Sequence, residues 1–184
     1  LSANPLTRLP GAPMIQEDLE RRIAAGRGLG FCWIDIDGFK GYNDRYGYAR
    51  GDQALLALGR ILETEAAAIA GALPGHIGGD DFAITCAASD ARPLAAAIAR
   101  AFDAAAASLH DAPDVERGFI ETFDRLGRAV RMPLLTVSIG GVTSERRALG
   151  SYARVVELAA EMKAYCKARR GPGSRWAFDR RGDF

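Results

Sequence analysis

Helix-like and strand-like segments alternate along this chain, and this alternation limits the possible fold more than any other feature. Apolar residues recur every three to four positions in four segments, which predicts helices at 13–25, 50–70, 92–109 and 151–169. A shorter helix is expected at 39–46. Short apolar runs bounded by turn residues predict strands at 29–36, 76–77, 82–86, 134–142 and 174–178. We therefore expect one sheet flanked by helices, with a central hairpin and an extra surface hairpin at 117–132.

The length and charge of the chain restrict what it can be. Its 184 residues, 48% of them hydrophobic and 26% charged, suit one folded domain and not a disordered segment. A formal net charge of +1 creates no long-range field toward nucleic acid or an anionic membrane. No apolar run reaches the roughly 18 residues of a membrane span. We expect residues 1–184 to form a single domain, with residues 1–12 as an irregular lead-in.

The cysteines and the first residues give expectations about the cellular compartment of the chain and about its origin. Cys32, Cys86 and Cys166 form no CxxC pair, which is typical of reduced thiols in a cytoplasmic protein. The chain does not begin with a charged-then-apolar export signal. Because its first residue is Leu1 and not Met, we expect it to be a piece of a longer protein.

An apolar strand that ends in two carboxylates is the first candidate for chemistry. Asp35 and Asp37 stand two positions apart, so both side chains face the same side of a strand. Gly38 and a helix start follow, where free amides can hold phosphate oxygens, and Lys40 adds a positive charge. Carboxylates beside such amides suit a metal–nucleotide site. Acidic strand ends are also common without any ligand.

Two further segments carry polar residues at informative positions. Asn43 offers both a donor and an acceptor and Asp52 offers acceptors, a pair that can read the edge of guanine. Asn43 as a turn residue and Asp52 as a helix cap would be the simpler interpretation. The turn Gly78-Gly79-Asp80-Asp81-Phe82 lets backbone approach a ligand and presents two acids to a hard cation. Taken alone it is equally a polar turn.

Together these segments resemble the GGDEF (diguanylate cyclase) family in order and spacing. The matching motifs are Asn4 to Pro10, Asp35 to Lys40, Asn43-Asp44 with Gly51-Asp52, Gly78 to Phe82, and Thr136 to Gly140. The resemblance covers nearly the whole chain. It implies an α/β (α+β) fold with a central, mainly antiparallel sheet flanked by helices, the ferredoxin-like palm of nucleotidyl cyclases.

The resemblance also implies a site and a reaction. The family binds GTP with Mg²⁺ (or Mn²⁺) and condenses two GTP molecules into cyclic di-GMP across a homodimer. The implied metal ligands are Asp35, Asp80 and the Ile36 carbonyl. The implied substrate contacts are Gly38, Phe39, Lys40, Asn43, Asp52, Gly79 and Lys167, and the implied catalytic residues are Asp80, Asp81 and Lys40. Lys163, Lys167 and Arg170 share one helix face, which fits a phosphate clamp or a solvated basic surface.

Several positions depart from the family pattern. Asp81 stands where glutamate is usual, and His76-Ile77 replaces an arginine and an aromatic. Gly171 replaces an arginine, and the sequence leaves open whether Arg169, Arg170 or Arg175 takes its place. The RxxD of the family's inhibitory product site falls on residues 69–72, which are Ile, Ala, Gly and Ala, so that site is predicted to be missing.

These departures leave three functions open. The first is a diguanylate cyclase. The second is a catalytically weak GGDEF domain that binds GTP or cyclic di-GMP and regulates a fused sensor or EAL phosphodiesterase domain, since the variant signature and the surface hairpin look like those of GGDEF domains beside EAL domains. A third is a purely structural domain, which the many polar residues at ligand spacings argue against.

Overall fold

β1 (Leu29–Asp37) is the central strand of a five-stranded sheet in the order β2-β3-β1-β6-β7. The computed structural model describes residues 3–169 and 171–182. Neighbouring strands are antiparallel except β6 and β7, which run parallel. The other strands of the sheet are β2 (Leu73–Gly78), β3 (Asp81–Ala87), β6 (Thr136–Thr143) and β7 (Arg175–Phe178). The expected mainly antiparallel sheet is confirmed.

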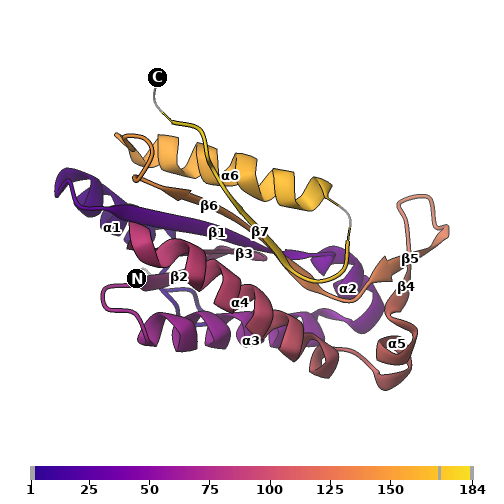
Figure 1. Ribbon diagram of the computed structural model, residues 1–184. Coiled ribbons are helices and arrows are strands. Elements are labelled where there is room, and N and C mark those ends of the chain that lie inside the picture. The colour runs from indigo at the N-terminus through magenta and orange to yellow at the C-terminus, as the bar shows by residue number, and fades with distance from the viewer. Residues whose placement is uncertain (1–2, 170, 183–184) are drawn as a thin grey trace.

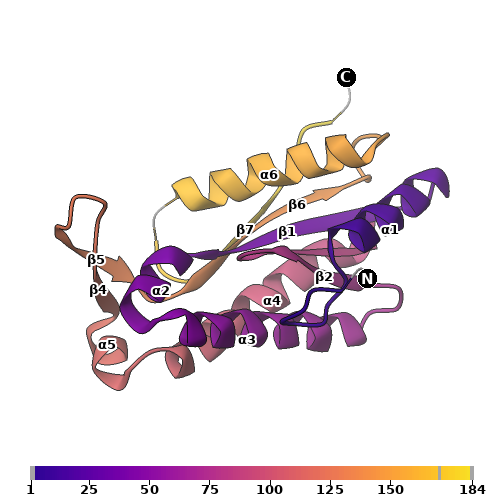
Figure 2. The same ribbon diagram turned by 180° about the vertical axis from the view of Figure 1, so that it is seen from behind.

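Four long helices cover the two faces of this sheet (Figures 1 and 2). The helices α1 (Ala12–Ala24) and α6 (Tyr152–Ala168) pack on one face. The helices α3 (Tyr48–Ala67) and α4 (Ala91–Ala106) pack on the other. Among the described residues, none of the helices has the length and apolar character needed to cross a membrane.

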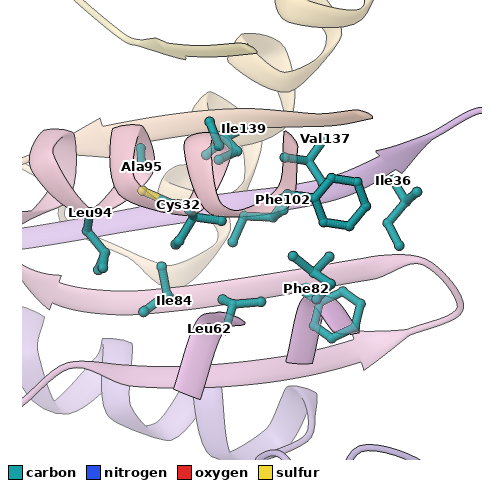
Figure 3. Packing of buried hydrophobic residues seen from close by; sticks show 14 of the residues in the cluster. Cys32, Ile36, Leu62, Phe82, Ile84, Leu94, Ala95, Phe102, Val137 and Ile139 are labelled. Carbon is teal, nitrogen blue, oxygen red and sulfur yellow. The ribbon is translucent and has the colours of Figure 1, made fainter. Parts of the chain in front are cut away.

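Both faces of β1 are buried, and this explains why it reads as a continuous apolar run. Its residues alternate between the two layers. Cys32, Ile34 and Ile36 join the core under α3 and α4, which Figure 3 shows from close by. Leu29 and Phe31 join the core under α1 and α6. The same alternation carries Asp35, at the end of the strand, to the α6 side, where it meets the helix's lysines.

A short helix and a separate hairpin lie beyond the end of β1. The helix α2 (Phe39–Tyr46) begins after Gly38, whose φ of 74° is left-handed and suits glycine. The extra hairpin consists of β4 (Phe119–Phe123) and β5 (Ala129–Pro133), and it projects from the body beside α2 (Figure 1). Met132 packs against Gly38 and Gly41, so the hairpin is anchored on the turn that starts α2.

The structure differs from the expected elements at several boundaries. The helix expected at 50–70 ends at Ala67, and that expected at 92–109 becomes 3₁₀ after Ala106. A short helix, α5 (Ala112–Arg117), was not expected and precedes the hairpin. In the lead-in, Leu9 is buried and Ala3 forms a bridge with Pro10, so these residues are ordered against the domain.

Candidate functional site

Three aspartates from different parts of the chain converge at the end of β1. Asp35 lies opposite Asp81 in the β1–β3 register, and Asp80 occupies the tight turn between β2 and β3. One carboxylate oxygen from each of the three lies within 4.8 Å of the others. Strand pairing fixes Asp35 beside Asp81, and the tight turn at the start of β3 adds Asp80.

Two lysines of α6 reach this cluster from above the sheet. The Lys163 ammonium lies 2.6 Å from Asp81 Oδ1 and 3.4 Å from Asp35 Oδ2. The Lys167 ammonium pairs with Asp35 Oδ1 and lies 3.9 Å from Asp37 Oδ1. Lysines four positions apart share a helix face, and here that face looks onto the acids. The third residue of the predicted basic face, Arg170, lies outside the described residues.

Burial and mutual repulsion set the charge state of this cluster. Burial raises the pKa of Asp80, and the neighbouring charge of Asp35 raises it further. Burial likewise raises the pKa of Asp37, although hydrogen bonds from Ser138 and Thr136 oppose the shift. Burial works against the charge of Lys167, but its contact with Asp35 outweighs this and raises its pKa. The site therefore favours added positive charge next to the carboxylates.

A glycine turn and the start of α2 follow directly after these acids. Gly38 takes the left-handed conformation, and Phe39 is the first residue of α2, so the first amides of the helix have no partner within it. Lys40 does not point toward the acids. Its ammonium lies 2.8 Å from Asp44 Oδ2 and its side chain is 82% exposed. The expected phosphate role of Lys40 would require this side chain to rotate.

A buried amide marks the predicted base-reading position. Asn43 Oδ1 is buried and accepts no hydrogen bond from any residue that the structure describes. It lies against Gly51 of α3, where an added Cβ would come within 1.9 Å of it. Asp52 follows Gly51 and is exposed. An unpaired buried amide oxygen is costly, so this atom is suited to a ligand that donates to it.

The turn between β2 and β3 is held by a histidine. His76 is buried, stacks on Phe82 with ring centres 4.0 Å apart, and hydrogen-bonds to the Gly79 carbonyl at 2.8 Å. Gly79 has a φ of 56°, which favours glycine there. The residue that departs from the family pattern at position 76 therefore supports the turn that carries Asp80.

A groove of about 650 Å³ continues from the acids along the end of α6. Its charged lining includes Asp37, Lys167, Arg169 and Arg175. Two of the three arginines considered as substitutes at the Gly171 position thus line the same groove as Lys167. The groove combines cations with an adjoining acidic cluster, which is the charge pattern that a metal-bound phosphate chain requires.

Sequence reasoning found most of these residues and missed some of their partners. Asp35, Asp80, Asp81 and Lys167 come together, with Gly79 in the turn beside them. Gly38, Phe39 and Asn43 lie in the adjoining turn and helix, whereas Asp52 and Lys40 are exposed. The side chain of Ile36 is in the core, which leaves its carbonyl as the group for the expected metal role. Trp33 was missed, although its Nε1 donates to Asp81 at 2.7 Å.

The acidic cluster fits a divalent cation. Asp35 Oδ1 is buried, and the Lys167 ammonium is its only partner among the residues that the structure describes. Several carboxylate oxygens within 4.8 Å match the preference of Mg²⁺ and Mn²⁺ for oxygen ligands. The residues present therefore suit the metal that the resemblance implies.

Comparison with known proteins identifies a family for this chain. The family model described as "Diguanylate cyclase, GGDEF domain" matches residues 2–122. The curated protein "Probable diguanylate cyclase DgcI" of Escherichia coli is 34% identical over 79 residues, and "Diguanylate cyclase DgcP" of the same species is 36% identical over 83. Each match covers 43% of this chain, but only 17% and 24% of those proteins, so the chain spans less than a quarter of their length.

Solved structures share the fold over nearly the whole chain. The GGDEF domain of TpbB (YfiN) from Pseudomonas aeruginosa superposes with a TM-score of 0.69 at 23% identity, covering 96% of this chain and 93% of that one. The GGDEF domain of DgcB from Caulobacter crescentus, in complex with c-di-GMP, gives 0.68 at 20% identity, covering 96% and 95%. At these identities the likeness establishes the fold.

Proposed function

Because this chain belongs to the family of diguanylate cyclase GGDEF domains, we propose that it binds GTP with Mg²⁺ or Mn²⁺ and condenses two GTP molecules into cyclic di-GMP. The observation that carries this proposal is the convergence of Asp35, Asp80 and Asp81, together with the unpaired Oδ1 of Asn43 in the helix that follows β1. A metal-binding cluster and a base-reading group then lie at the same end of β1, as one bound nucleotide requires.

The proposed roles follow from where each group lies. Asp35, Asp80 and the Ile36 carbonyl hold the divalent cation, which neutralises charge on the phosphates. The free amides of Gly38 and Phe39 hold phosphate oxygens together with Lys167, and Lys40 joins them after leaving Asp44. Asn43 reads guanine, with Asp52 at the edge of the base. Gly79 lies in the turn that carries Asp80, where the lack of a side chain lets the substrate approach the backbone.

Two such half-sites form the proposed reaction centre. The 3′-hydroxyl of each GTP attacks the α-phosphorus of the other, a phosphodiester bond forms, and pyrophosphate leaves. In this proposal Asp80, which lies beside the reacting groups, takes up the 3′-proton. One chain supplies half of the groups, so a homodimer is part of the mechanism. We propose that residues 1–184 act as a single cytoplasmic domain within a longer signalling protein.

A turnover assay over a range of protein concentrations tests this proposal. Purified protein with GTP and Mg²⁺ is expected to yield cyclic di-GMP and pyrophosphate, at a rate that rises faster than linearly with protein concentration while dimers are scarce. Asp35→Ala is expected to abolish the product, because it removes a buried ligand of the cluster. Absence of product at high protein concentration, with no difference between wild type and Asp35→Ala, would refute cyclase activity.

A second function is favoured by how two residues are engaged. Lys40 is paired with Asp44, and Asp81 accepts from both Trp33 and Lys163, so neither faces a substrate directly. A domain that binds GTP or cyclic di-GMP and relays occupancy to a fused sensor or EAL domain would need no turnover. Calorimetry separates the two functions, since Mg²⁺-dependent GTP binding without product supports the regulatory domain.

A further inference from the structure

We propose that the Lys163 ammonium is a built-in counter-ion of the acidic cluster that competes with the divalent cation for Asp35 and Asp81. This inference deepens the proposed function and rests on the cluster's binding a metal. Lys163 approaches both carboxylates, at 2.6 Å from Asp81 Oδ1 and 3.4 Å from Asp35 Oδ2. Its side chain is only 16% exposed, so the charge is held inside the site and not in solvent.

Close packing of α6 on β6 fixes the position of the Lys163 backbone. At Gly140 an added Cβ would lie 2.3 Å from the backbone nitrogen of Lys163 and 2.1 Å from the Ala159 carbonyl oxygen. Gly140 is the register partner of Trp33, which places the Lys163 backbone above that strand position. The lysine stem therefore has a short, defined path to the acids two residues further along β1.

The indole of Trp33 holds the ammonium from another side. Lys163 Nζ lies 5.0 Å from the centre of the Trp33 ring, within the range of a cation–π contact. Trp33 Nε1 also donates to Asp81 Oδ1, the oxygen that Lys163 contacts. Asp81 Oδ1 thus already accepts from two donors, which reduces its capacity to ligate a cation.

The charge count of the site matches a single added divalent ion. Four carboxylates, Asp35, Asp37, Asp80 and Asp81, gather with two ammonium groups, Lys163 and Lys167. Four negative and two positive charges leave a formal charge of −2, which one divalent cation neutralises. Without Lys163 the formal charge becomes −3 and Asp81 loses its ammonium contact, while Asp35 keeps its ion pair with Lys167. Affinity for the first ion therefore rises and Asp81 becomes a ligand.

A Mn²⁺ titration without nucleotide tests the competition directly. Free Mn²⁺ is followed by electron paramagnetic resonance for wild type and Lys163→Met, whose stem still packs on Trp33. We expect Lys163→Met to bind Mn²⁺ at least about tenfold more tightly, because a positive charge near the ion is gone. Arg154→Met is the matched control: it removes an exposed cation from the first turn of the same helix and should change affinity less than about twofold.

A double-mutant cycle tests whether Asp81 is the carboxylate that Lys163 prevents from binding the cation. Asp81→Asn is expected to change Mn²⁺ affinity by less than about threefold in wild type, but to lower it about tenfold in the Lys163→Met protein. An equal effect in the two backgrounds contradicts the inference. Circular dichroism and thermal melting check that each variant is folded, and Lys163→Arg, which keeps the charge, should bind Mn²⁺ like wild type.

The outcomes separate this inference from the proposed function. Equal or weaker Mn²⁺ binding by Lys163→Met overturns the competition, while Mn²⁺ binding by wild type still supports the proposed metal site. No Mn²⁺ binding by wild type or Lys163→Met, with or without GTP, overturns both. The inference is supported if Lys163→Met binds Mn²⁺ more tightly than wild type while Arg154→Met does not.

Discussion

Asp80 sits half-buried between two other carboxylates, so its charge opposes folding when no cation is bound. Burial and the neighbouring charge of Asp35 raise its pKa, which means that the folded state binds the proton more tightly than the unfolded chain does. This contribution stabilises the protein at low pH and is lost as the pH rises through the folded pKa. At neutral pH, the charge of Asp80 therefore lowers the stability of the metal-free protein.

We predict that Asp80→Asn raises the stability of the metal-free protein at about pH 7. The gain should fall within the roughly 0.5–2 kcal/mol usual for stabilising substitutions, and the same variant should lose Mn²⁺ binding. Urea denaturation in the presence of a chelator measures the first effect. Repeating it at about pH 4 is the control, since the advantage shrinks where wild-type Asp80 is protonated. A loss of stability at neutral pH would contradict the electrostatic account.

Position 51 needs glycine because the side-chain amide of Asn43 leaves no room for a Cβ there, and not because the backbone takes a left-handed conformation. It lies inside α3, where alanine normally favours a helix over glycine by about 1 kcal/mol. An added Cβ would nevertheless lie 1.9 Å from Asn43 Oδ1. Either the Asn43 side chain or the α2–α3 packing must therefore move to accept it.

We predict that Gly51→Ala lowers GTP affinity by about tenfold or more, because the hydrogen-bonding atom of Asn43 is displaced. The preference for GTP over ATP should fall as well, which calorimetry with both nucleotides measures. Gly150→Ala is the matched control, since nothing lies within 4 Å of its added Cβ. Unchanged guanine selectivity in Gly51→Ala would remove Asn43 from the base-reading role.

The order of motifs indicated Asp35, Asp80 and Asn43 as candidate site residues, but it did not indicate the contacts around them. Lys163 was predicted to face phosphate or solvent, whereas it contacts Asp35 and Asp81. That contact depends on the rotation of α6, which Gly140 sets through close packing on β6. The bond from Trp33 to Asp81 depends on the strand register. Neither long-range feature has a local signal in the sequence.

At the scale of elements, a buried aspartate ties α1 to the sheet. Asp18 accepts hydrogen bonds from Thr85 of β3 and from Arg21 and Arg22 of its own helix. Burial acts to raise the pKa of Asp18, but these hydrogen bonds outweigh it and lower the pKa below its ordinary value of 3.8. A lowered folded pKa gives stability that is present above the ordinary pKa and is lost as the pH falls through the folded one.

We predict that Asp18→Asn destabilises the protein by about 1–3 kcal/mol at about pH 7, because charge-assisted hydrogen bonds become neutral ones. The difference between the two proteins should narrow as the pH falls below about 4, where wild-type Asp18 takes up a proton. Chemical denaturation over a pH series measures it. Exposed Glu157→Gln on α6 serves as a control with little change. A pH-independent difference would mean that the charge of Asp18 is not what anchors α1.

Long elements were predictable and a short one was not. The helix expected at 13–25 is Ala12–Ala24, and the strand expected at 29–36 is Leu29–Asp37, because each has a strong periodic or apolar pattern. The six-residue α5 is too short for periodicity to mark it. Its sequence does carry end signals, Pro113 in the first turn and Gly118 in the left-handed conformation at its end.

At the scale of the molecule, the described residues of one chain contain one set of the groups that the proposed function assigns to GTP. The acidic cluster and the unpaired Oδ1 of Asn43 in α2 belong to this set. The hairpin β4–β5 lies beside α2, at the end of β1, and projects from the body of the domain (Figure 2). If each chain binds one GTP, both bond-forming steps need a second chain, and the two steps are chemically equivalent.

This equivalence predicts how the protein handles a substrate that can react only once. GTP mixed with 3′-deoxy-GTP should give a linear dinucleotide, because the 3′-hydroxyl of GTP attacks the α-phosphorus of the analogue, while the analogue has no hydroxyl with which to close the ring. One pyrophosphate should appear for each linear product, which anion-exchange chromatography and a pyrophosphate assay measure. With 3′-deoxy-GTP alone neither product should form. A cyclic product from the mixture that contains the deoxy sugar, or linear product formed equally well by Asp35→Ala, would exclude the symmetrical two-chain reaction.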